Sequence, residues 1–337
     1  MEKSVAAEVV RAKDTPDRNV GDFLLAIISE NIYCRLMYKQ LLVPYDGSPF
    51  SARALPIAAA LARRTGATLH LVLVHDPSSY IPFVAAEVAV PVYDSELEHE
   101  RRGHDRRALE AQVATLASQG VLVSSRLLEG TTIEALVEYG QEIGADLTVM
   151  TTHGRGGFER LRLGSVASAY LVRATNPVLL VRGSGTDAVP VVPSGSLLCP
   201  LDGSPFSEAM IPHARAFAEA LDMPMALFGV TVPHAMPMAP IGTELLADPG
   251  ALEAESDGRH QYLARMLAQC PVGATAHATT DLSVARAILE EAERIDAGVI
   301  ALASHGRSGL MRLMLGSVAD EIVRHAELPV LLYRPES

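Results

Sequence analysis

The sequence has few cysteines and no long apolar run. Its 337 residues include three cysteines, Cys34, Cys199 and Cys270, which lie far apart along the chain. Three widely spaced cysteines fit neither a disulfide framework nor a zinc site, so we expect a reducing compartment. No apolar run reaches the roughly 18 residues that a membrane-spanning helix needs, and the short run at 23–28 makes a poor secretory leader. We therefore expect a cytoplasmic protein with no membrane partner.

Positive charge is also scarce. The formal net charge is -12, from 28 Lys and Arg against 40 Asp and Glu. This balance argues against a general affinity for nucleic acid or for anionic membranes. An anionic ligand would need a local positive site, and arginines do gather in two corresponding stretches, although solvated loop charge is the simpler explanation for most of them: Arg155, Arg160, Arg162, Arg307 and Arg312.

Several catalytic motifs are absent. There is no Gly-x-x-x-x-Gly-Lys-Ser/Thr segment, which excludes a P-loop ATPase. The glycines at 154–157 lack the dinucleotide-binding spacing and follow the fourth predicted strand instead of the first. The sequence offers no Ser-His-Asp arrangement and no metal-ligand cluster. We therefore identify no catalytic residues.

The most informative feature is a stretch that occurs twice, at 152–167 and 304–319. Each copy follows a short apolar run, at 147–150 and 299–303, and ends in Gly-Ser before a helical pattern. Glycines allow sharp turns and close approach to a ligand. A serine at a helix start can cap the helix, or can offer its hydroxyl beside free N–H groups to a phosphate. The repetition favours a phosphate-binding loop over a plain strand-to-helix connection.

The chain divides into two repeats. We predict an extension at 1–37, a first domain at 38–183, a linker at 184–195 and a second domain at 196–334; the length fits about two domains. Apolar strands alternate with helices in both domains, including helices at 52–64 and 205–221, with Ser48 as a cap. This pattern indicates an α/β fold, with a parallel sheet covered by helices on both faces.

Two features would meet at one crevice of such a sheet. The first strand of each repeat ends at Asp46 or Asp202, and the fourth strand ends at the glycine loop. Ligands of open parallel sheets bind beyond the carboxyl ends of the strands, where the winding reverses. Either Asp could also bond its own backbone in an Asp-Gly turn.

These residues resemble the universal stress protein family in its tandem two-domain form, over about residues 38–183 and 196–334. The resemblance rests on the Asp-Gly-Ser turns and on a glycine separated by nine residues from a Gly-Ser pair, at 154–165 and 306–317. ATP-binding members carry one further glycine, which is Thr151 or Ala303 here. The resemblance implies two open-sheet, adenine nucleotide alpha-hydrolase-like domains, each a five-stranded parallel sheet of order 3-2-1-4-5.

The resemblance also implies ATP, with or without Mg²⁺, as ligand. Ribose or base would contact Asp46 and Asp202, beside walls formed by Pro44 and Pro200. Asp76 in the first repeat, and Thr231 in the second, would lie against adenine near the end of the second strand, with Met150 and Leu302 flanking the base. The phosphates would be lined by two corresponding sets of residues: His153, Gly154, Arg155, Gly164, Ser165 and Val166, and His305, Gly306, Arg307, Gly316, Ser317 and Val318. Either histidine could instead close its loop by hydrogen bonds.

Three functions remain open at this point. The first is a cytoplasmic stress-response protein that senses or sequesters ATP and hydrolyses it slowly at most. We expect its two sites to differ in affinity, because the 233–250 loop carries four prolines and could hinder entry to the second site or act as a lid. The second is an interaction module without a nucleotide, given Thr151 and Ala303. The third is an enzyme of the related alpha-hydrolase group.

The fifth strands, 178–181 and 330–333, should lie at sheet edges, where apolar strands need cover. The family resemblance implies that these two strands pair within one chain. The sequence leaves open whether two chains form a homodimer.

Overall fold

The computed structural model describes residues 37–76, 95–152, 163–182, 192–233, 249–304 and 315–335. The first repeat contains the strands β1 (Gln40–Pro44), β2 (Thr68–His75), β3 (Val123–Glu129), β4 (Leu147–Thr151) and β5 (Val178–Val181). Its helices are η2 (Ser51–Ala54), α3 (Leu55–Thr65), α4 (Ser95–Ser118), α5 (Thr132–Glu142) and α6 (Ser165–Arg173).

The second repeat follows the same order. Its strands are β6 (Ser196–Pro200), β7 (Met225–Thr231), β8 (Thr275–Thr280), β9 (Ala297–Ala303) and β10 (Val330–Tyr333). Its helices are α7 (Pro205–Glu208), α8 (Ile211–Leu221), α9 (Pro249–Met266), η4 (Leu267–Gln269), α10 (Val284–Arg294) and α11 (Ser317–His325). The predicted alternation of strands and helices is thus confirmed.

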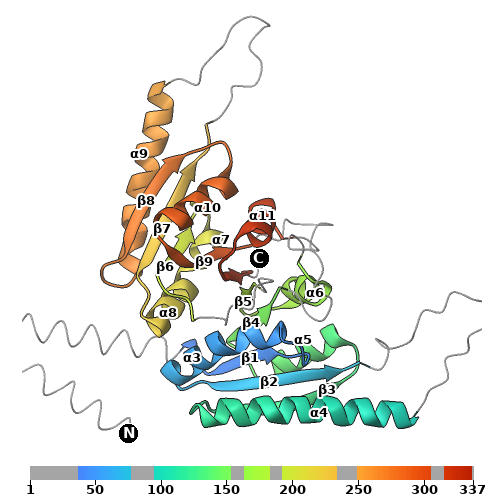
Figure 1. Ribbon diagram of the computed structural model, residues 1–337. Coiled ribbons are helices and arrows are strands. Elements are labelled where there is room, and N and C mark those ends of the chain that lie inside the picture. The colour runs from blue at the N-terminus through green and yellow to red at the C-terminus, as the bar shows by residue number, and fades with distance from the viewer. Residues whose placement is uncertain are drawn as a thin grey trace, which may run out of the picture.

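All ten strands form one sheet, of order β3-β2-β1-β4-β5-β10-β9-β6-β7-β8 (Figure 1). Neighbours within each repeat are parallel, and the predicted order 3-2-1-4-5 is confirmed in both halves. The two halves meet at β5 and β10, which pair antiparallel with Leu331 opposite Leu179. Neither fifth strand is therefore a sheet edge in this structure.

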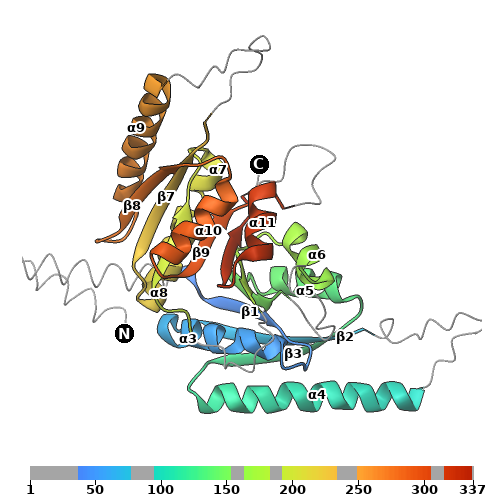
Figure 2. The same cartoon turned by 45° about the horizontal axis from the view of Figure 1, so that its top comes forward.

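Helices cover both faces of the sheet, as predicted. One buried apolar layer contains Leu179 and Leu331 and packs under α3, α4, α8 and α9. The other contains Leu180 and Leu332 and packs under α5, α6, α10 and α11. Figure 2 shows these helices in the spatial order α5, α6, α11, α10. Successive side chains of a strand point to opposite faces, so each short central strand contributes to both layers.

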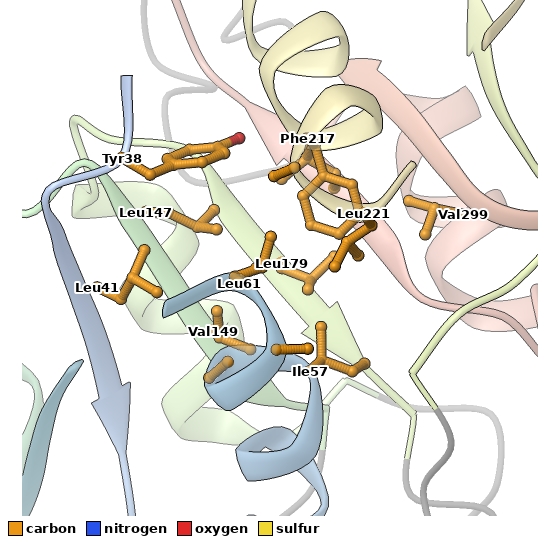
Figure 3. Packing of buried hydrophobic residues seen from close by; sticks show 14 of the residues in the cluster. Tyr38, Leu41, Ile57, Leu61, Leu147, Val149, Leu179, Phe217, Leu221 and Val299 are labelled. Atoms are coloured by element: carbon orange, nitrogen blue, oxygen red, sulfur yellow. The ribbon is translucent and has the colours of Figure 1, made fainter. Parts of the chain in front are cut away.

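The first layer is continuous between the repeats. Helix α3 lies against α8, and Ile57 and Leu61 of α3 share a cluster with Phe217 and Leu221 of α8 (Figure 3). The hydroxyl of Tyr38 donates to the backbone carbonyl of His213 in α8 at 3.3 Å. Apolar burial on this scale is the main force that holds packed elements together.

Two arginines reach across the junction in reciprocal fashion. Arg182, just after β5, donates to the backbone carbonyls of Ala326, at 2.5 Å, and of Arg324, both at the C-terminal end of α11. Arg334, just after β10, donates to the carbonyl of Val172 in the last turn of α6 at 2.9 Å. The last carbonyls of a helix lack partners within it and carry partial negative charge, so each repeat caps a helix of the other.

Two predicted helices start differently from expectation. The helix predicted at 205–221 is divided into α7 and α8, and the one predicted at 52–64 begins as the 3-10 turn η2 before α3. Pro56 and Pro212 explain both cases, because each lies in the first turn of the α-helix. A proline has no N–H to bond the carbonyl four residues earlier. The Ser48 hydroxyl accepts the Ser51 N–H at 3.1 Å, but the N-cap of η2 is Phe50, so the prediction that Ser48 is the cap is wrong.

Candidate functional site

The carboxyl end of the first strand turns in the same way in both repeats. The Ser48 N–H donates to Asp46 Oδ1 at 2.9 Å, and the Ser204 N–H donates to Asp202 Oδ1 at 2.8 Å. The intervening glycines, Gly47 and Gly203, have φ of 81° and 91°. Both aspartates therefore make the Asx turn that an Asp-Gly sequence favours. Asp46 is half-buried, whereas Asp202 is exposed.

The repeated loop ends on a helix N-terminus in both halves. Gly164 is the N-cap of α6 and Gly316 the N-cap of α11, both with extended backbone and without a side-chain cap. Ser165 and Ser317 are the first helical residues, and their side chains are exposed. The capping alternative for these serines is therefore wrong.

Free helix N-termini suit anions. The first N–H groups of a helix have no acceptor within it, and the helix dipole favours negative charge there. Val166 is exposed and Val318 half-buried on the next position of each helix. The Gly164 N–H donates to the Thr152 carbonyl at 2.7 Å, which ties the start of α6 to the end of β4.

The ends of β1 and β4 lie side by side. Leu41 pairs with Leu147 and Leu42 with Thr148, so both strands run parallel toward the same edge. In the second repeat, β6 and β9 are neighbours in the same way. The Asp turns and the helix N-termini therefore share one end of the sheet, at the point where the strand order reverses. This is where ligands of open α/β sheets bind.

The remaining predicted residues are distributed unevenly. Pro44 and Pro200 are half-buried at the ends of β1 and β6. Met150 and Leu302 are buried in the layer under α5, α6, α10 and α11. Six predicted residues lie outside the part of the chain that the structure describes: His153, Gly154, Arg155, His305, Gly306 and Arg307.

The register of the second strand distinguishes the two repeats. Asp76 follows β2, is half-buried, and accepts a hydrogen bond from the Thr132 hydroxyl at 3.5 Å. Pro44 pairs with Val72, and Pro200 pairs with Phe228. Thr231, three residues beyond Phe228, therefore corresponds to His75 and not to Asp76.

Sequence reasoning overlooked a buried ionic cluster at the carboxyl end of β2. His75, at the end of β2, lies between two carboxylates of α4, with Nδ1 2.7 Å from Asp105 Oδ2 and Nε2 2.5 Å from Glu98 Oε1. Burial lowers the pKa of His75, but the hydrogen bonds and charges of Asp105 and Glu98 outweigh it and raise the pKa overall. The seven-residue spacing of Glu98 and Asp105, which places both on one helix face, was the available indication.

The described part of the chain offers little for metal or membrane chemistry. It holds no group of three or more His, Cys, Asp or Glu side chains placed to bind a metal ion. Among its helices, none combines the length and apolar character needed to cross a membrane.

Comparisons with known proteins agree with this architecture. The profile described as "Universal stress protein family" matches twice, at residues 37–182 and 195–334. A universal stress protein of Mycolicibacterium smegmatis is 28% identical over 306 residues, which cover 88% of this chain and 97% of that protein. A shorter one, from Thermus aquaticus, is 34% identical over 147 residues, 43% of this chain and all of the relative.

A solved structure is similar in fold over most of the chain. It is a universal stress protein from Archaeoglobus fulgidus, with a TM-score of 0.62 and 16% identity, covering 88% of this chain and 98% of that one. The two profile matches together span most of the sequence, one on each repeat. The chain therefore belongs to the universal stress protein family, with two tandem domains.

Proposed function

We propose that the protein binds an adenine nucleotide, principally ATP, at the carboxyl ends of β1 and β4, of β6 and β9, or of both pairs. The observation that carries the proposal is the pair of glycine-capped helix N-termini at Gly164 and Gly316, each beside an exposed serine. Neither glycine has a Cβ to occupy the place of a phosphate, and the first amides of α6 and α11 are placed to donate to one.

The nucleotide would lie across the reversal of the strand order. Its phosphates would contact the starts of α6 and α11, together with the loop residues at 153–155 and 305–307. Its ribose would face Asp46 or Asp202, with Pro44 or Pro200 as a wall. The phosphates could carry Mg²⁺, because they supply the oxygen ligands that this ion prefers.

The proposed role is that of a cytoplasmic stress-response sensor that holds or reports ATP. Family membership supports a function in the stress response. The proposed domains are 38–183 and 196–334, joined by the linker 184–195 after an extension at 1–37. We propose that β5 and β10 keep the two domains paired in solution, as in a dimer, with further homodimerisation an option for the assembled chain.

Titration calorimetry with ATP and Mg²⁺ tests the proposal. We expect saturable binding with at most two sites per chain, and a rise in the unfolding temperature at millimolar ATP, because a ligand of the native state stabilises it. The matched control is the double variant Gly164→Glu and Gly316→Glu, which should bind neither ATP nor its magnesium complex. Absence of heat and of any thermal shift in the wild type would overturn the proposal.

The alternative is an interaction module that has lost its nucleotide. It is favoured by Thr151 and Ala303, which replace the first glycine of the pattern in ATP-binding members. A side chain at either position could crowd the loop. Freshly purified protein distinguishes the two functions, because release of bound nucleotide on denaturation would exclude the interaction module.

A further inference from the structure

An arginine of α9, Arg259, lies over a glycine of β7, Gly229, in the second repeat. A methyl group on Gly229 would come within 2.7 Å of Arg259 Cδ and 2.9 Å of Cγ, and within 3.2 Å of Leu263. Gly229 is buried in the middle of β7. The absence of a side chain there is therefore what allows the Arg259 stem to pass across the strand.

The same arginine reaches the Asp turn of the second repeat. A methyl group on Gly203 would lie 3.4 Å from Arg259 Nη1. The guanidinium thus lies beside the turn at the carboxyl end of β6, within the proposed nucleotide site. Gly203 has φ of 91°, a left-handed conformation that favours glycine.

Within the described residues, Arg259 has no ion pair or hydrogen bond, although two carboxylates lie on the neighbouring elements. Asp202 Oδ1 accepts the N–H of Ser204 at 2.8 Å, and Glu208 Oε1 accepts the hydroxyl of Tyr262 at 3.1 Å. Each acid therefore has a donor other than Arg259. A half-buried guanidinium has five N–H donors in a planar fork that matches phosphate oxygens.

A second group at this place also lacks a partner. The hydroxyl of Thr231 is buried, with the residue 1% exposed, and it has no hydrogen-bond partner among the described residues. Thr231 and Gly229 are two residues apart on β7, so their side-chain positions share the face that α9 covers. A buried hydroxyl is rarely left without a partner, and a ligand oxygen would satisfy it.

Among the described residues of the first repeat, the corresponding place is occupied differently. Asp105 precedes the buried Leu109 of α4 by four residues, as Arg259 precedes the buried Leu263 of α9. At the place of Thr231, the first repeat has His75, whose ring is held by Asp105 and Glu98. In the first repeat, His75, Asp105 and Glu98 thus satisfy one another by hydrogen bonds. In the second repeat, Thr231 and the cationic Arg259 stand at the corresponding places without such partners among the described residues.

We propose that Arg259 and Thr231 form an anion subsite in the second domain, which holds a phosphate on the ribose of the nucleotide. The inference rests on the proposed function. β6 lies between β7 and β9 in the sheet, so Arg259 and the α11 N-terminus stand on opposite sides of the nucleotide. The second domain would therefore prefer a nucleoside bisphosphate, with one phosphate at the 5′ position and one at the 2′ or 3′ position.

Calorimetry on the full-length chain tests the subsite. Adenosine 3′,5′-bisphosphate and adenosine 2′,5′-bisphosphate are compared with AMP in the Gly164→Glu background, which confines binding to the second domain. We expect one bisphosphate to bind about tenfold more tightly than AMP, the gain typical of a charge-assisted hydrogen bond. This preference should fall as ionic strength rises.

Two variants should abolish the preference, measured in each variant as the ratio of the dissociation constants of AMP and the bisphosphate. Arg259→Met keeps the apolar stem over Gly229 but removes the charge. Gly229→Ala keeps the charge but displaces the stem. Arg265→Met, an exposed arginine farther along α9, is the matched control and should retain the preference.

The outcomes separate the two proposals. If AMP and both bisphosphates bind equally, or if the preference survives in Arg259→Met, the anion subsite is overturned and the nucleotide site stands. If no adenine nucleotide binds to the wild type, both proposals fall. Loss of the preference in Arg265→Met as well would assign it to general charge attraction and would also overturn the subsite.

Discussion

The imidazole of His75 lies 2.7 Å from the carboxylate of Asp105, from Nδ1 to Oδ2, although His75 is only 2% exposed. Glu98 contacts the other ring nitrogen. Glu129 of β3 is the register partner of His75 and is itself paired with Arg102. Two carboxylates on one buried ring favour the protonated form and raise the pKa of His75, so His75 joins α4 to the end of β2 most strongly when the ring is charged.

The stabilisation from His75 should depend on pH in a defined direction. The folded state raises the pKa of His75 above its ordinary value of 6.5. The contribution is therefore fully present below pH 6.5 and is lost as pH rises through the folded pKa. We expect His75→Gln to reduce the unfolding free energy by about 1–3 kcal/mol at pH 6, and by less at pH 9.

Urea unfolding of the wild type and the variant at both pH values measures this difference. His99→Gln, at an exposed position of α4, is the control and should show no pH-dependent difference. A His75→Gln effect of equal size at pH 6 and pH 9 would contradict the charged pairing.

The reciprocal arginines should stabilise the junction between the repeats. Arg182 caps α11 and Arg334 caps α6. We expect Arg182→Ala and Arg334→Ala each to lower the unfolding free energy by about 1–2 kcal/mol, because each leaves helix carbonyls without a charged donor. Arg63→Ala, at an exposed position on α3, should change it by less than about 0.5 kcal/mol. Losses no larger than that of Arg63→Ala would count against the caps.

The first repeat on its own should associate. A fragment of residues 38–183 would expose the edge of β5, which β10 covers in the full chain. An apolar unpaired edge strand invites pairing with another copy. We expect light scattering after size exclusion to detect dimers or larger species. A well-behaved monomer of the unsubstituted fragment at high concentration would refute the proposed pairing.

The two proposed nucleotide sites should differ in affinity. Gly164 and Gly316 have extended backbone that any residue adopts, so Gly164→Glu and Gly316→Glu should fold. The new side chain would occupy the phosphate position and repel it. ATP titration should show that each single variant loses one of two unequal sites, since His75 and Asp105 in one repeat correspond to Thr231 and Arg259 in the other. Equal losses of affinity and heat in both variants would contradict the asymmetry.

Much of the fold could be predicted from the sequence because the determinants are local. Apolar runs such as 147–150 and 299–303 are too short for typical helices, and the turn residues that flank them favour buried strands. The repeated Asp-Gly-Ser turn specified its own hydrogen bonds, since Asp46 and Asp202 bond the backbone two residues on. Even the two divided helices had a local cause, in Pro56 and Pro212.

Only the tertiary structure decided which residues face one another across elements. The pairing of β7 with β6 shows that Thr231 corresponds to His75, one residue before the predicted counterpart Asp76. A one-residue difference in register changes the face of every side chain. The packing of α4 and α9 brought Asp105 and Arg259 to corresponding places with opposite charge, which neither helix shows alone. The antiparallel pairing of β5 with β10 likewise joins two segments about 150 residues apart. The apolar sequence of an edge strand indicates that the strand needs cover, but it does not identify the segment that covers it.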